Sequence, residues 1–150
     1  MVVSSKKRVH FCMILILLNV AFIWGNSLLP AEISAALSSY VKRLILFLVP
    51  EDGPPAVAGT GLLRKIAHVL EFTCLGALWC WYMLMGRRKA YFAYLPAGCV
   101  ACIDETIQCF VPGRGPRVTD VVIDLGGVTL GIGALLLIQY FKSKKRRNKS

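Results

Sequence analysis

Four long apolar runs dominate this chain of 150 residues. They cover residues 11–29, 66–85, 91–111 and 118–141. A helix needs about 20 consecutive apolar residues to cross the hydrocarbon core of a bilayer, and soluble domains of this size rarely carry several such runs. The composition agrees, with 56% hydrophobic residues and a mean hydropathy of +0.60. The sequence therefore predicts a single all-α, polytopic membrane domain over residues 1–150, with four transmembrane helices.

Residues 31–49 differ from these runs because apolar residues recur there at helical spacing. The apolar positions are Ile33, Leu37, Tyr40, Val41, Leu44 and Leu48, and the polar ones lie mainly on the other side. This pattern favours an amphipathic helix lying in the membrane interface, on the outer surface. The alternative is a loop that packs on the bundle. Residues 50–55, Pro-Glu-Asp-Gly-Pro-Pro, then predict a break in regular structure.

The first apolar run follows a short basic head, a pattern that fits either a first transmembrane helix or a signal peptide. Its apolar part is long for a signal peptide, which favours the transmembrane helix. Residues 33–36, Ile-Ser-Ala-Ala, nevertheless offer small residues at which a signal peptide could be cleaved.

Basic residues indicate the orientation. Twelve of the 18 Lys and Arg residues precede the first run, separate the second from the third, or follow the fourth. Cytoplasmic connections are enriched in Lys and Arg, so both termini are predicted to be cytoplasmic in a multi-pass protein of the cell membrane. Because these residues flank the apolar runs, the net charge of +10 indicates contact with the lipid bilayer and no nucleic-acid partner. The basic tail, residues 142–149, is expected to be disordered.

Polar residues gather at one end of the predicted bundle, in the outer half of the membrane. Five of the eight acidic residues are among them. The candidate polar site comprises Lys65, His68, Glu71, Asp104, Glu105, Gln108, Arg114, Arg117, Asp120 and Asp124. Charged side chains inside a membrane are costly and usually functional, so these residues are predicted to form a site. Scattered stabilising residues would not be expected to segregate to one leaflet.

Two further expectations concern packing. Glu105 comes late in its helix, where the helix dipole disfavours an anion, so it needs a basic partner. Arg114 is the first choice for this partner and Lys65 the second. Gly127 and Gly131 form a GxxxG pattern, which lets another helix approach closely. The predicted neighbour is the helix over 91–111, and the same pattern permits a homodimer.

The order of these polar residues resembles the VanZ-like family. The motifs are Lys65-x-x-His68-x-x-Glu71-Phe72, then Asp104-Glu105-x-x-Gln108 with Pro-Gly-Arg114, then Asp120 and the GxxxG pattern, and more loosely Asn26-Ser27. Members are small bacterial membrane proteins named for a teicoplanin-resistance factor. Two positions depart from the family pattern: Phe72 stands where tyrosine is frequent, and Asp124 where asparagine is frequent. The resemblance implies a bacterial protein linked to the cell envelope and to glycopeptide resistance.

Three functions fit the residues and the resemblance. The first is a binding or accessory protein whose basic turn, with Arg114 and Arg117, engages an anionic envelope lipid or peptidoglycan precursor. The second is a metal-assisted hydrolase or transferase acting on an envelope lipid. His68, Glu71, Asp104, Glu105 and Asp120 could then hold a divalent ion, although no HExxH signature is present. The third is a structural bundle. The sequence leaves the cofactor, and whether the protein is catalytic, undetermined.

Overall fold

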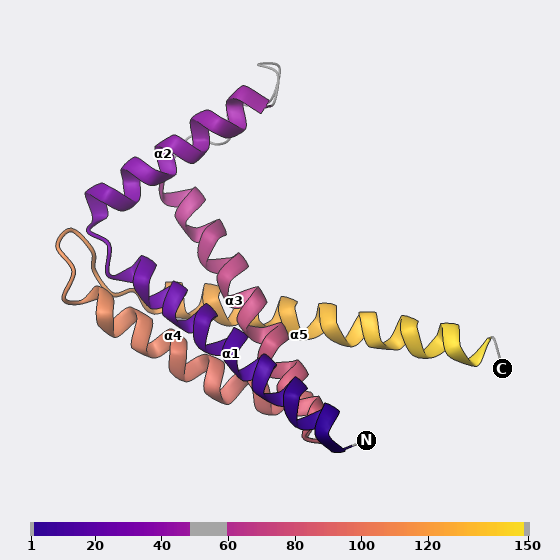
Figure 1. Ribbon diagram of the computed structural model, residues 1–150. Helices are drawn as coiled ribbons and strands as arrows, with labels where there is room; N and C mark the ends of the chain where they lie inside the picture. The colour runs from indigo at the N-terminus through magenta and orange to yellow at the C-terminus, as the bar shows by residue number, and fades with distance from the viewer. Residues whose placement is uncertain (1, 49–59, 149–150) are drawn as a thin grey trace.

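The computed structural model describes residues 2–48 and 60–148 (Figure 1). Its elements are α1 (Val2–Ser27), α2 (Ala31–Leu48), α3 (Thr60–Met85), a 3₁₀ turn η1 (Ala90–Ala93), α4 (Tyr94–Gln108) and α5 (Val118–Arg147). Within the described ranges no strand occurs, which confirms the all-α prediction. The predicted break at residues 50–55 lies outside the described residues.

Three of the described helices are long and apolar enough to cross a membrane, namely Lys6–Ser27 of α1, Leu63–Met85 of α3 and all of α5. The third predicted span differs, because the helix expected over 91–111 begins as the 3₁₀ turn η1 and ends at Gln108. The 15 residues of α4 extend about 22 Å, less than the roughly 30 Å of a hydrocarbon core. Pro112 and Gly113, the latter with φ of +72°, lie in the turn that follows and separate α4 from α5.

The contact between α3 and α5 is the most extensive between any two described elements. Within this contact, three glycines bring the two backbones close together, namely Gly76 of α3 with Gly127 and Gly131 of α5, which we call the glycine seam. A Cβ at Gly127 would lie 2.7 Å from the Val69 carbonyl oxygen, and one at Gly131 would collide with the Thr73 carbonyl oxygen. Only glycine lets the two backbones come this close.

The glycine seam settles one packing prediction in part. The expectation that Gly127 and Gly131 face another helix is confirmed, but the neighbour is α3 and not the helix over 91–111. Helical spacing shows that two glycines share a face and does not identify the helix that covers it. Both glycines are buried inside the chain. A homodimer through them remains untested and would compete with the contact to α3.

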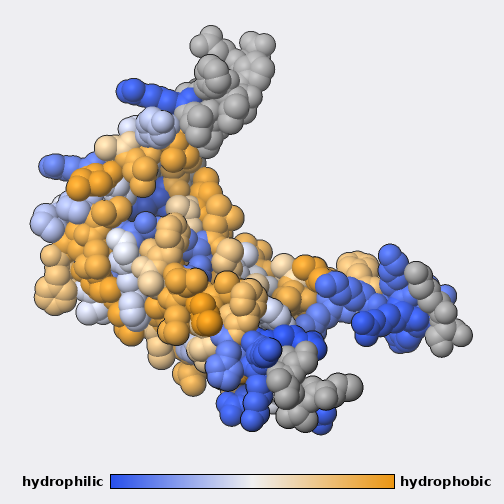
Figure 2. Space-filling view, in the orientation of Figure 1, coloured by the Kyte–Doolittle hydropathy of each residue, from blue (hydrophilic) through white to orange (hydrophobic). Residues whose placement is uncertain are grey.

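The rest of the bundle is a small apolar core inside a broad apolar surface. Ile16 and Ile23 of α1 pack with Phe72 and Leu75 of α3, all at most 1% exposed. Outward-facing positions are also apolar, as at Leu17 of α1, which is 61% exposed. Figure 2 shows hydrophobic residues over most of the visible bundle and hydrophilic residues near both chain ends. This is the distribution expected of helices surrounded by lipid.

The second predicted element is a helix rather than a loop, since α2 is helical from Ala31 to Leu48. It contacts α3, and its far end projects beyond the other helices in Figure 1. Ile33, Leu37 and Tyr40 of its apolar face are 53%, 54% and 69% exposed. These residues are therefore not covered by the bundle.

The basic tail also differs from expectation. Residues 142–147 continue α5 as regular helix, so the predicted disorder of this part is wrong. Lys and Arg are good helix formers, and positive charge near a helix C-terminus is favoured by the helix dipole. Four basic residues, Lys144, Lys145, Arg146 and Arg147, form the last turn. Residue 149 lies outside the described residues.

Candidate functional site

One end of the bundle brings together parts of every long helix. The turn between α4 and α5 is fastened to the junction of α1 and α2 by two hydrogen bonds. The Ala31 N–H donates to the Pro112 carbonyl at 3.3 Å, and Arg114 Nη2 donates to the Asn26 carbonyl at 3.1 Å. Residues 64–68 of α3 and 120–124 of α5 line one small cavity at this end, so the polar residues of four segments can meet there.

The centre of this end is a group of three residues, His68 of α3, Asp104 of α4 and Asp124 of α5, which we call the carboxylate cluster. His68 Nδ1 lies 3.5 Å from Asp124 Oδ1 and 4.0 Å from Asp104 Oδ2. Both aspartates are completely buried. Gln108 Nε2 donates a hydrogen bond of 2.9 Å to Asp104 Oδ2 and fixes the orientation of that carboxylate.

Several buried atoms of the carboxylate cluster lack hydrogen bonds. They are Asp104 Oδ1, both carboxylate oxygens of Asp124 and His68 Nδ1. The 3.5 Å between His68 and Asp124 is longer than a normal hydrogen bond, so this contact is at most a loose ion pair. One potential ligand atom from each residue lies within 4.8 Å of the other two, a spacing that could hold a metal ion. This set contains Asp124, which the predicted metal ligands did not include, and omits Glu71, Glu105 and Asp120.

Glu105 has partners other than those predicted. Its Oε2 accepts a 2.8 Å hydrogen bond from the backbone N–H of Arg117, and its Oε1 accepts one of 3.3 Å from Gln108 Nε2. No ion pair joins Glu105 to Arg114 or Lys65 in the described part of the chain. The predicted pairing is therefore wrong. A backbone N–H beside the start of α5 takes the place of a basic side chain, and a sequence does not reveal such a partner.

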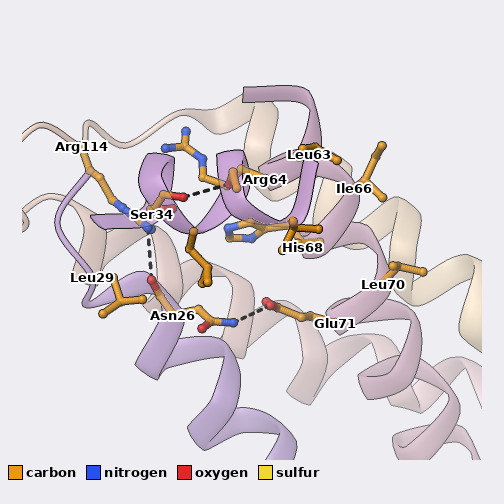
Figure 3. A pocket seen from close by; sticks show the side chains of 14 residues that line it. Asn26, Leu29, Ser34, Leu63, Arg64, Ile66, His68, Leu70, Glu71 and Arg114 are labelled. Carbon is orange, nitrogen blue, oxygen red and sulfur yellow. Dashed lines mark hydrogen bonds between the residues drawn. The ribbon is translucent and has the colours of Figure 1, made fainter. Parts of the chain in front are cut away.

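Glu71 and Arg114 share Asn26, the residue before the last one of α1. Asn26 Nδ2 donates a 2.7 Å hydrogen bond to Glu71 Oε1, while the Asn26 carbonyl accepts from Arg114. Both contacts are drawn in Figure 3. Glu71 Oε2 remains without a hydrogen-bond partner. Asn26 thus connects an acid on α3 to a base in the turn before α5.

Three predicted site residues lie at the edge. Lys65 and the side chain of Arg117 are exposed, and Asp120 is half-buried in the first turn of α5. Asp120 accepts a 3.3 Å hydrogen bond from the neighbouring Thr119 hydroxyl. Lys65 and Asp120 line a small cavity that reaches His68 and Asp124. They therefore flank the carboxylate cluster and do not contact it through any hydrogen bond found in the described residues.

A larger cavity of about 320 Å³ opens beside the carboxylate cluster, between α1, α2 and α3 (Figure 3). Its wall is mostly apolar and carries two arginines and two other ionisable residues. The lining residues are Asn26, Leu29, Ser34, Leu37, Ser38, Val41, Leu63, Arg64, Ile66, Ala67, His68, Leu70, Glu71 and Arg114.

Arg114 is the most unusual side chain of this cavity. Its Nε and Nη1 atoms are buried and have no hydrogen-bond partner. Burial lowers the pKa of Arg114, and the nearby positive charge of Arg64 lowers that pKa further. A guanidinium nevertheless stays protonated in proteins, so Arg114 places a charged group with unused, buried donors at the wall of the cavity.

Three residues of this end were not among the predicted site residues. Asn26 joins Glu71 to Arg114, Ser27 is completely buried with its Oγ 3.5 Å from Gln108 Nε2, and Arg64 lines the cavity. The polar pair Asn26-Ser27 interrupts an apolar run, which was the available signal. For Arg64, the sequence favoured a residue that only marks the membrane boundary.

Comparison with known proteins agrees with these motifs. The chain matches the VanZ/LLP1 family over residues 10–139. It belongs to that family. The match confirms the resemblance carried by the polar motifs, and the family's name connects this membrane protein to glycopeptide resistance. No curated protein and no solved structure gave a significant match.

Proposed function

We propose that this VanZ/LLP1 protein binds an anionic amphiphile of the bacterial cell envelope, with the acidic head group at Arg114 and an apolar chain in the adjacent cavity. The observation that carries the proposal is that two nitrogens of Arg114, Nε and Nη1, are buried without a partner beside a largely apolar wall. Envelope lipids and lipid-linked peptidoglycan precursors combine these two chemical properties.

The energetics favour a ligand at Arg114. A buried donor without a partner costs about 1–3 kcal/mol, and a charged donor costs more. Nε and Nη1 lie on different edges of the guanidinium, and an anionic phosphate or carboxylate oxygen is a strong acceptor for either of these charged donors. Arg64 in the same cavity adds a second positive charge. Asn26 holds Glu71 through its side chain and Arg114 Nη2 through its carbonyl, which leaves Arg114 Nε and Nη1 for the ligand.

The proposed membrane placement puts this site in the outer leaflet. Both termini are cytoplasmic in this arrangement, as the excess of basic residues near the predicted inner ends supports. At 1.5–2 Å per residue, η1 and α4 together extend about 30 Å, which suits a fourth pass through the hydrocarbon core. The exposed apolar face of α2 then lies in the outer interface, above the cavity.

This placement gives a physical route to glycopeptide resistance. Glycopeptides act outside the cytoplasm, where the proposed site would hold a lipid-linked envelope component. Binding at Arg114 would shield that component or change its availability. The link to teicoplanin rests on the name of the family and is part of the proposal.

The test compares Arg114→Gln with Arg117→Gln, which removes the same charge from the same turn. The side chain of Arg117 is exposed and its only described contact to the site comes from its backbone, so Arg117→Gln is the matched control. Binding of a polyprenyl phosphate to purified protein is measured by native mass spectrometry in detergent. Arg114→Gln should weaken binding at least about tenfold, which corresponds to about 1.4 kcal/mol, and Arg117→Gln should change it less than about threefold.

A second measurement connects binding to the cell. Teicoplanin susceptibility of a host expressing each variant is normalised to the amount of protein in its membrane. Arg114→Lys keeps the charge but loses the bidentate geometry, so it should fall between the wild type and Arg114→Gln. Equal binding and equal protection by all variants would contradict the proposal, and would favour a structural role for these residues.

A further inference from the structure

We propose that the carboxylate cluster, His68, Asp104 and Asp124, is a divalent metal site, and that Zn²⁺ is the ion its donors favour. The site goes beyond amphiphile binding, because its ligands do not include Arg114 and, although His68 also borders the cavity, it would exist with or without a ligand there.

The first argument is the burial of unpaired charge. Asp104 and Asp124 are both fully buried, and three of their four carboxylate oxygens have no hydrogen-bond donor. His68 can supply one positive charge at most, against two carboxylates. Removing charges from water without compensation is costly, and buried charges in proteins are normally paired or bound to metal. A divalent cation supplies the missing positive charge.

No lysine or arginine in the described part of the chain forms an ion pair with these two aspartates, although Arg114 acts on Asp104 from a distance. Lys65 is exposed and forms no ion pair found in the described residues, although it lines the small cavity beside the cluster. Arg114 directs Nη2 to the Asn26 carbonyl, and its other two nitrogens are unpartnered. Neither base donates a hydrogen bond to Asp104 or Asp124 in the described part of the chain.

The second argument is geometry. Three ligands at about 2.0–2.1 Å from a tetrahedral Zn²⁺ lie roughly 3.3–3.4 Å from one another. His68 Nδ1 is 3.5 Å from Asp124 Oδ1 and 4.0 Å from Asp104 Oδ2. The two distances from His68 must therefore shorten by about 0.1–0.7 Å. The Asp104 and Asp124 ligand atoms lie within 4.8 Å of each other and must approach by at most about 1.5 Å, which rotation of the side chains can supply. The residues come from three different helices, and the bundle holds them in this arrangement.

The third argument is the type of donor. One imidazole nitrogen with two carboxylate groups is a set that Zn²⁺ accepts, whereas Mg²⁺ and Ca²⁺ prefer oxygen alone. Gln108 already donates to Asp104 Oδ2 and so plays the orienting role that outer-sphere groups have at metal sites. Three protein ligands leave a coordination position open, and His68 borders the large cavity.

The test measures Zn²⁺ binding to purified protein in detergent by isothermal titration. The protein carries a purification tag without histidine and the double substitution Cys99→Ser/Cys102→Ser, because these two cysteines are exposed and have a spacing that can bind zinc. The proposal expects about one equivalent of Zn²⁺, and at least about tenfold weaker binding after Asp124→Asn. Asp120→Asn is the matched control, with the same change a turn earlier on α5, and should bind within about twofold of the parent protein.

Cobalt gives an independent readout. Co²⁺ bound at a nitrogen and oxygen site should produce visible d–d absorption without the sulfur charge-transfer band of a cysteine site. His68→Gln should abolish this absorption, and provides a second variant if Asp124→Asn does not fold. Absence of Zn²⁺ binding by the parent protein, or equal affinity of the Asp124→Asn and Asp120→Asn variants, would overturn the proposal. Arg114→Gln should retain the metal, so the outcome is separable from that of amphiphile binding.

Discussion

The same two helices build two regions of opposite character. In the glycine seam, α3 and α5 meet backbone to backbone, and Gly131 leaves no room for a further carbon. A turn away, in the carboxylate cluster, His68 and Asp124 face each other with polar atoms that have no hydrogen bond. The glycine seam is fully packed by the protein itself, whereas the carboxylate cluster contains buried polar atoms that the protein leaves without partners.

The two regions depend on each other. Gly127 follows Asp124 by less than a turn of α5, and its contact with the backbone near Phe72 lies one turn beyond His68 on α3. The close approach at the glycines therefore sets how near Asp124 comes to His68. Small residues bring the helices together, and the polar residues use the proximity that results.

The largest effect is expected from Gly131→Leu. The added side chain would collide with the Thr73 carbonyl and with the Ala77 backbone nitrogen, so the helices must separate. Overpacking of this kind typically costs about 1–3 kcal/mol or more. The thermal midpoint of the protein in detergent should fall, whereas Gly133→Leu, where a Cβ meets nothing within 4 Å, should leave it nearly unchanged. Equal midpoints would show that the seam opens freely.

Asp124→Asn should raise the stability of the protein, in contrast to Gly131→Leu, when a chelator has removed any bound metal. Removing a buried carboxylate that has no hydrogen bonds removes a charge whose burial is unfavourable. We expect a gain of about 1–3 kcal/mol in the free energy of unfolding, seen as a higher melting midpoint. A loss of stability in the chelator would mean that the loose pair with His68 outweighs desolvation.

Glu105→Gln should lower stability by a smaller amount. The carboxylate accepts from both the Arg117 N–H and Gln108 Nε2, while an amide offers one oxygen and opposes the other donor with an NH₂ group. The expected cost is about 1–2 kcal/mol in denaturant or thermal unfolding. Arg117→Ala is the control, since it keeps the backbone N–H. Were Arg117→Ala as damaging as Glu105→Gln, the partner would be the side chain after all.

The smallest effect concerns Gly126→Ala. A Cβ at Gly126 meets no atom within 4 Å, and alanine favours a helix over glycine by about 1 kcal/mol. The melting midpoint should stay the same or rise slightly. Gly127→Ala, one position later, should lower the midpoint because its Cβ would lie 2.7 Å from the Val69 carbonyl. Equal melting midpoints for Gly126→Ala and Gly127→Ala would show that close packing at the glycine seam is not confined to the face of α5 that carries Gly127.

The sequence predicted the features of single helices better than it predicted which helices pack against each other. Apolar length predicted three spans now found in α1, α3 and α5, and the four-residue spacing correctly placed Gly127 and Gly131 on a shared buried face. The spacing did not predict that α3 covers that face, because it shows which residues of one helix share a face and not which helix packs against them. The third span was overestimated because apolar residues continue beyond Gln108 after the helix has ended.

The site shows the same division. Chain order and depth predicted that acids from different helices would lie at one end, and His68, Asp104 and Asp124 do approach there. The partner of Glu105 could not be predicted, because it is a backbone N–H that becomes available only where α5 begins. The role of Asn26 was missed for a similar reason, since its side chain and carbonyl reach α3 and a distant turn simultaneously.

The length of α5 has a consequence for the surrounding bilayer. Its apolar part, residues 118–141, extends about 36 Å, whereas a typical hydrocarbon core is about 30 Å thick. Hydrophobic mismatch of this size is relieved by tilting the helix or by thickening the nearby lipid. The glycine seam fixes α5 against α3, so a change of tilt must carry both helices together. Membrane thickness is therefore coupled to the position of His68 and Asp124, which move together, relative to Asp104 of α4, and lipids with longer chains should alter the properties of the carboxylate cluster without contacting any of its residues.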